Sequence, residues 1–121
     1  MWFELRSADT DSHIYIKPSY KEWGDSITRL EVVLGLHQTT THHIHGSIET
    51  ANEGAIGKLG SGINSTAVAS FECGSGATTQ MILSASDDIR LEAGYNYLTV
   101  LQYGNETVTF ANANHSCKFL M

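Results

Sequence analysis

Short runs of β-branched and aromatic residues, each bounded by turn-forming residues, constrain the fold of this chain more than any other feature. The runs that fit an extended strand are Trp2–Arg6, His13–Lys17, Ile27–Leu34, His43–Glu49, Thr66–Glu72 and Gln80–Ala85. The best helix candidate, Ser86–Gly94, is short, and we expect a strand there with a turn in front of it. The sequence therefore predicts an all-β fold in one domain, residues 1–121: an antiparallel β-sandwich or jelly roll of about eight or nine short strands.

The clearest local signal is a predicted β-hairpin near the C-terminus. Asn96–Tyr103 and Glu106–Ala111 flank the pair Gly104-Asn105, which permits the positive φ angles of a tight primed turn. Pairing outward from that turn gives one strongly apolar face, which carries Leu101, Val108 and Phe110. We predict that these three side chains are among the most buried in the protein.

Charge and hydropathy exclude two classes of partner. The 13 acidic and 7 basic residues give a net charge of −6, and the basic residues are scattered, so we expect no nucleic-acid partner. The apolar runs are far shorter than the ~20 residues that span a bilayer, so we expect no membrane insertion. The N-terminal residues do not resemble a signal peptide.

The sequence shows no catalytic pattern. The serines lie in no Gly-x-Ser-x-Gly elbow, and Cys73 has no recognisable base beside it. The glycine-rich stretch Gly54–Gly62 lacks the order of a phosphate-binding loop, and we expect it to be a mobile surface loop. Cys73 and Cys117 are either a disulfide or two buried free thiols, and the sequence leaves both alternatives open. We predict neither an enzyme nor a bound cofactor.

One cluster of histidines is a candidate metal site. His43 and His45 point to the same side of a strand, His42 points to the other side, and Glu49 follows shortly after. Two imidazoles on one face with a third ligand nearby suit zinc, iron or manganese. Against this, we favour the prediction that the Thr- and His-rich run is solvent-exposed at a strand edge and binds no metal.

Two known patterns resemble this cluster. His43-x-His45-x3-Glu49 resembles the first half of the metal motif of the cupins, small β-barrels in which two His, a Glu and a later His hold a catalytic metal. That resemblance implies a metal bound by His43, His45 and Glu49, with His115 as the later ligand, but the expected glycines are displaced and the second half-motif is absent. The His-x-His also resembles the tips of bacteriophage spikes and short tail fibres, where a trimer binds one metal ion on its axis.

We expect function to lie in surfaces, because no site chemistry is visible. The first hypothesis is a non-enzymatic structural subunit of a larger assembly, located in the virion of a phage or virus as a capsid-surface decoration or a tail or fibre protein. Its partners are other protein subunits, including copies of itself. The alternatives are an extracellular or cell-surface adhesion module that binds glycans or proteins, and a cupin-like enzyme.

The apolar ends of the chain also bear on the hypothesis of a structural subunit. The apolar residues Met1–Phe3 and Phe119–Met121 are expected to lie either in the chain's own sheet or against a neighbouring subunit. The retained Met1 favours a complete phage or viral gene product over a secreted pilin.

Overall fold

The computed structural model describes residues 1–23, 29–76 and 78–120, and its regular structure is entirely β. The strands of this described part are β1 (Trp2–Glu22), β2 (Leu30–Leu34), β3 (Gln38–Thr50), β4 (Gly57–Ile63), β5 (Ala69–Ser75), β6 (Met81–Leu91) and β7 (Gly94–Leu120). Every pairing between them is antiparallel, which confirms the predicted all-β, antiparallel class.

The described part has seven strands, fewer than the eight or nine expected, because two strands are long. β1 runs through both predicted strands Trp2–Arg6 and His13–Lys17, and β7 runs through the two arms of the predicted hairpin. The predicted strand Ile27–Leu34 starts within residues 24–28, which lie outside the described residues, and its described part is β2. Met121 also lies outside the described residues.

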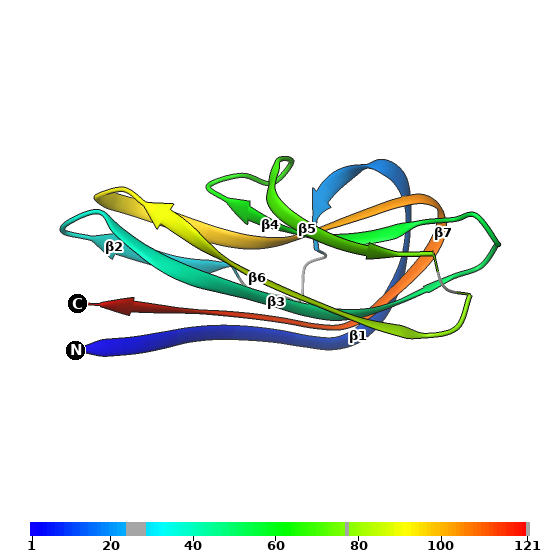
Figure 1. The fold of residues 1–121 in the computed structure, drawn as a ribbon, viewed down its shortest axis with the longest axis horizontal. Helices are drawn as coiled ribbons and strands as arrows, with labels where there is room; N and C mark the ends of the chain where they lie inside the picture. Colours follow the sequence, from blue (N-terminus) through cyan, green and yellow to red (C-terminus); the bar gives the residue numbers. More distant parts are fainter. Residues whose placement is uncertain (24–28, 77, 121) are drawn as a thin grey trace.

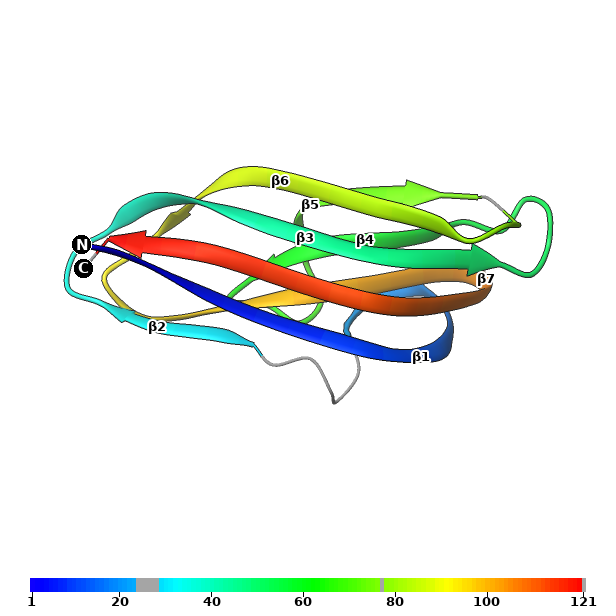
Figure 2. The same cartoon turned by 90° about the horizontal axis from the view of Figure 1, so that it is seen from below.

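β7 is the strand that joins the two layers of the molecule. Its first half pairs with β2, β4 and the end of β1, and its second half pairs with β3 and the first part of β1. Figures 1 and 2 show β7 running along one layer, turning at the end opposite the termini, and returning along the other. β5 extends the layer of β4, and β6 extends the layer of β3. Both ends of the chain lie side by side, because Trp2 pairs with Leu120.

The predicted hairpin at Gly104-Asn105 is wrong. The two halves of β7 are not paired with each other, and Gly104 instead pairs with Lys17 and Gly57. The physical reason is that other strands occupy both edges of β7, so its halves face each other through side chains across the core. The predicted burial is confirmed, since Leu101, Val108 and Phe110 are each 0% exposed.

The core lies between the two layers and follows the period of two that strands impose. In β2, Leu30, Val32 and Leu34 point inward while Glu31 and Val33 point outward. Residues of both layers form two adjoining apolar clusters. Burial of this surface is the main stabilising contribution to such a fold.

Trp23, the residue that follows β1, is fully buried, and its backbone N–H donates to the Val100 carbonyl at 2.8 Å. Its indole Nε1 donates a hydrogen bond to Oδ2 of Asp9 at 3.1 Å, and its ring packs edge-on against Phe110 at 5.5 Å between centroids. The indole N–H is therefore satisfied inside the core, which makes full burial of this large side chain favourable.

The predicted mobile loop at Gly54–Gly62 is also wrong, because most of it forms β4. This strand lies between β5 and β7, and nearly all of its residues are buried. Its glycines have a packing role: a Cβ on Gly60 would lie 3.0 Å from the ring of Tyr20, and a Cβ on Gly62 would overlap the Thr99 hydroxyl. Close approach of neighbouring chain segments, and not flexibility, accounts for the glycines.

Ser86–Gly94 is the best helix candidate in the sequence, but a strand is predicted there. The prediction is confirmed for Ser86–Leu91, which belongs to β6. β6 continues through Ser86, Asp87 and Asp88 without the expected turn, because each of these residues pairs with a residue of β3.

Candidate functional site

The three residues of the candidate metal site lie on the outward face of β3. His43 and Glu49 are exposed, and His45 is half-buried with its Nδ1 at 3.2 Å from Nδ2 of Asn114. An extended strand rises ~3.3 Å per residue, so Glu49 lies about 20 Å along the strand from His43. Residues 1–23, 29–76 and 78–120 contain no group of three or more His, Cys, Asp or Glu side chains placed to hold one metal ion. The structure thus brings His43 and His45 to one face but does not bring Glu49 to them.

His42 lies on the opposite side of β3, inside the core. The expectation that the whole Thr- and His-rich run is solvent-exposed is wrong here, because Thr40 and His42 are buried. The inward side of His42 follows from alternation with Ile44, a signal present in the sequence. His115, the later ligand in the cupin resemblance, also points inward, away from His43 and His45.

His42 forms a buried polar relay with Ser61 and His115. Its Nδ1 lies 2.7 Å from Oγ of Ser61, and its Nε2 lies 3.0 Å from Nδ1 of His115. Burial, together with smaller contributions from the nearby His115 and His43, lowers the pKa of His42 to about 3. Because Ser61 is also fully buried, no substrate reaches its hydroxyl, and the relay is part of the packed core.

A groove of about 760 Å³ crosses the outward face of the layer that contains β1, β7, β3 and β6. Its lining combines aromatic side chains with hydroxyl, imidazole and charged groups: Trp2, Phe3, Glu4, Thr39, Thr40, Thr41, His43, Asp88 and Lys118. Glu4 and Lys118 are direct cross-strand partners, as are Thr41 and Asp88. We call this set the Trp2 groove.

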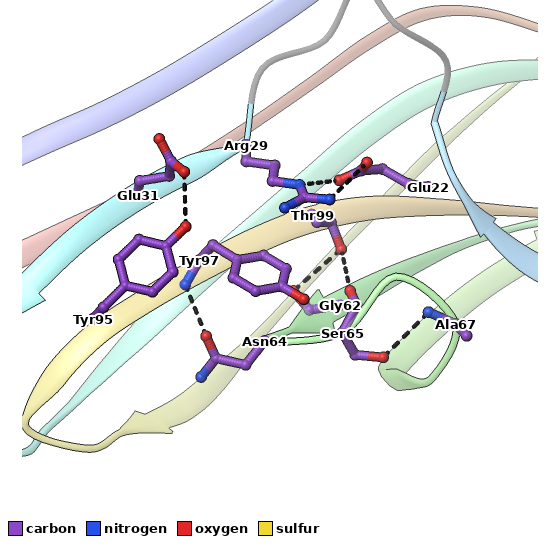
Figure 3. Close-up of polar contacts among 10 residues, drawn as sticks. All are labelled: Glu22, Arg29, Glu31, Gly62, Asn64, Ser65, Ala67, Tyr95, Tyr97 and Thr99. Atoms are coloured by element: carbon purple, nitrogen blue, oxygen red, sulfur yellow. Dashed lines mark hydrogen bonds and ion pairs between the residues drawn. The ribbon is translucent and has the colours of Figure 1, made fainter.

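The outward face of the other layer carries a cluster of aromatic and charged residues on β2, β7 and the residue before β2. It consists of Arg29, Glu31, Val33, Tyr95 and Tyr97, and we call it the Tyr–Arg face. Figure 3 shows its polar and aromatic members Arg29, Glu31, Tyr95 and Tyr97. Glu31 pairs with Tyr97 and Val33 pairs with Tyr95, so the set is contiguous across the two strands. Val33 and Tyr95 are 66% and 55% exposed.

Polar contacts fix the side chains of the Tyr–Arg face. The Arg29 guanidinium lies 4.6 Å from the centroid of the Tyr97 ring, and its Nε donates to Glu22 at 2.6 Å. The Tyr95 hydroxyl donates to Glu31 at 2.7 Å, which raises the pKa of that phenol. Figure 3 shows these contacts side by side, together with the Tyr97 backbone N–H donating to Asn64 at 2.8 Å.

A second tyrosine pair lies further along the same layer. Tyr20 and Tyr103 have their ring centroids 5.5 Å apart, and the ammonium of Lys58 lies 4.9 Å from the Tyr103 ring. Burial and a hydrogen bond to Glu72 raise the pKa of Tyr20, so this hydroxyl stays protonated. These contacts tie the end of β1 to β4, β5 and β7.

The cysteines are free thiols, which settles the alternative that the sequence left open. Cys73 is half-buried on β5 and Cys117 is buried on β7. Burial raises the pKa of both thiols, so both are protonated near neutral pH and lack the thiolate that a nucleophile requires.

Comparison with known proteins supplies no further assignment. No protein-family model matches the chain, and no curated protein matches it significantly. In the part of the chain that the structure describes, no helix is long and apolar enough to cross a membrane.

Proposed function

We propose that this chain is a non-enzymatic structural subunit of a larger assembly, in particular a virion component of a phage or virus such as a capsid-surface decoration or a tail or fibre protein. The observation that carries the proposal is the Tyr–Arg face. Tyrosine and arginine are enriched among the residues that dominate binding energy in protein interfaces. In this protein two tyrosines, an arginine and an exposed valine lie together on neighbouring strands. The partners we propose are further copies of this chain.

The arrangement of the Tyr–Arg face favours association. Arg29 is held between Tyr97 and Glu22, and Tyr95 is held by Glu31, so these side chains lose little rotamer freedom when a partner binds. The exposed area of Val33 and Tyr95 is apolar surface that a partner would remove from water. An ordered face of this composition is better suited to a stable interface than a set of free side chains.

The two-layer arrangement supports the proposed class of assembly. We propose that the fold is a β-sandwich, with β5, β4, β2 and the first half of β7 in one layer and β6, β3 and the second half of β7 in the other. Two-sheet antiparallel folds recur in viral capsid and lectin domains. That recurrence, together with the Tyr–Arg face, is the basis for placing the chain in a virion.

The test is the mass of the native particle, measured by sedimentation velocity and native mass spectrometry. We expect the wild-type chain to form a closed assembly with a mass that is a multiple of 13.2 kDa. The double variant Arg29→Ala with Tyr95→Ala should raise the dissociation constant by about tenfold or more. Arg90→Ala is the matched control, because Arg90 is also an exposed arginine paired with a nearby glutamate but lies in the other layer.

A wild-type chain that stays a 13.2 kDa monomer at high concentration would contradict the proposal. Equal weakening of the assembly by the Arg90 variant and the double variant would place the interface outside the Tyr–Arg face.

A further inference from the structure

The Trp2 groove combines an exposed tryptophan with charged and hydroxyl side chains, and a sheet face that only contacts water does not need the tryptophan. Trp2 leaves 59% of its surface exposed at one end of the groove, although tryptophan is among the most costly side chains to leave in water. Beside it, the Glu4 carboxylate, the Lys118 ammonium and the Thr41 and Asp88 side chains follow one another across the strands. The groove therefore joins one apolar wall to a row of hydrogen-bonding groups.

Backbone pairing decides which ligands this groove can take. β3 is paired on one edge with β6 and on the other with β7, and β7 is paired here with β1 and β3. Both edges of β3 and β7 are therefore occupied at the floor of the groove, so an extended peptide cannot add a strand there. The outer edges of β1 and β6, which border the groove, have no strand partner in the described part of the chain. A ligand that lies over β3 and β7 is therefore recognised by their side chains.

The side chains offer both hydrogen-bond donors and acceptors at close spacing. The Thr41 hydroxyl donates to Asp88 at 2.7 Å, which fixes one carboxylate oxygen and leaves the other free to accept. Glu4 accepts from Arg6 at 2.8 Å, and Lys118 provides an ammonium donor directly across from it. With two carboxylates and one ammonium group, the groove does not carry the strong positive charge that an anionic ligand would need.

We propose that the Trp2 groove binds a neutral saccharide. A sugar ring presents an apolar C–H face that matches the indole of Trp2. Its hydroxyl edge can both donate to Asp88 and Glu4 and accept from Lys118 and Thr39. The groove volume of about 760 Å³ accommodates an oligosaccharide of a few rings. This inference is independent of the proposed assembly, because the groove and the Tyr–Arg face lie on different layers.

The test uses an array of neutral oligosaccharides built from glucose, galactose, mannose and N-acetylglucosamine, followed by calorimetric titration of the best binder. We expect Trp2→Ala and Asp88→Asn each to lower the affinity about tenfold or more. The matched control is Glu49→Gln, which makes the same carboxylate-to-amide change on the outward face of β3, away from the groove. This control should bind like the wild type. Backbone amide shifts of the wild type on titration should concentrate at Thr39–His43 and Lys118.

Several results would overturn the proposal: no oligosaccharide bound above background, binding unaffected by Trp2→Ala and Asp88→Asn, or amide shifts confined to another face. If Trp2→Ala lowers the mass of the native particle, the groove is part of an interface between protein subunits, and the proposal that it binds a saccharide is wrong. All variants are surface changes, and unfolding curves that coincide with the wild type would show that each is folded. The particle-mass measurement of the wild type separately tests the proposed assembly.

Discussion

His42 is a polar side chain that lies in the core with both of its ring nitrogens satisfied. The imidazole is 0% exposed, yet both ring nitrogens have partners, Ser61 on β4 and His115 on β7. In the contact between Nε2 of His42 and Nδ1 of His115, one nitrogen donates and the other accepts, so a proton added to the accepting nitrogen would remove this hydrogen bond. The ring also packs edge-on against Phe71 of β5, 6.2 Å between centroids. Burial of His42 is therefore favourable only while its imidazole is neutral.

The first prediction is a loss of stability in mild acid that depends on His42. Its pKa is lowered from 6.5 to about 3 in the folded protein, so below pH 6.5 the unfolded chain binds a proton that the folded chain does not. His42 therefore leaves the free energy of unfolding unchanged above that pH and reduces it as the pH falls, by about 1.4 kcal/mol per pH unit. Urea unfolding at about pH 7 and about pH 5 measures this dependence.

The matched variants for this prediction are His42→Gln and His43→Gln. Removal of the buried imidazole should make the stability less dependent on pH, and His43→Gln is the control because it makes the same change at an exposed position of the same strand. Equal pH dependence in the wild type and His42→Gln would contradict the account of the relay.

At the scale of elements, the glycine-rich strand β4 is closely packed against its neighbours. It pairs with β5 on one side and β7 on the other. Gly62 pairs with Thr99, whose hydroxyl also donates to the Ser65 carbonyl at 2.8 Å. The loop after β4 folds back over this point, and only a residue without a side chain leaves room for it.

The second prediction is that Gly62→Ala destabilises the protein through this contact. A Cβ at Gly62 would overlap the Thr99 hydroxyl and the Ser65 carbonyl oxygen, and neither lies at the end of a long flexible side chain. We expect the free energy of unfolding to fall by about 1–3 kcal/mol, the usual cost of overpacking. Gly35→Ala is the control, since a Cβ there meets nothing within 4 Å. Comparable urea midpoints for the two variants would show that β4 tolerates side chains.

At the scale of the whole molecule, the layers depend on the two long strands. β7 alone pairs with β1, β2, β3 and β4, and β1 follows it from one layer into the other. Among the described residues, β5 and β6 each pair with one strand only. The middle of β7 therefore cannot open without breaking both layers.

The third prediction concerns native-state hydrogen exchange. Amides of β7 at Leu101–Gln102 and Val108–Cys117 should exchange only by global unfolding, because strands lie on both of their edges. Amides of β5 and β6 that face away from their single partner should exchange orders of magnitude faster. Mass spectrometry of peptic fragments checks this. Protection of β5 equal to that of β7 would mean that the layers open as one unit.

The candidate surfaces were only partly predictable. Alternation along β3 correctly placed His43 and His45 on one side and His42 on the other, but it did not reveal that the His42 side is the core or that His42 meets Ser61 and His115. The Tyr–Arg face could not be predicted, since Tyr95 and Glu31 are 64 residues apart in the chain. Such contacts depend on which strands become neighbours.

The sequence by itself determined the all-β class and, through the period of two, which side chains of a strand face the core. The burial of Val108 and Phe110 follows from this local pattern, whereas Leu101 lies in the stretch 98–102 that is buried on both faces. Only the tertiary structure decided that Gly104-Asn105 is a bend between layers and that Gly57–Ile63 is a buried strand. The physical reason is that glycine permits a turn, a loop or a close approach of strands equally well. The choice among these depends on hydrogen bonds and packing to partners that are distant in the sequence.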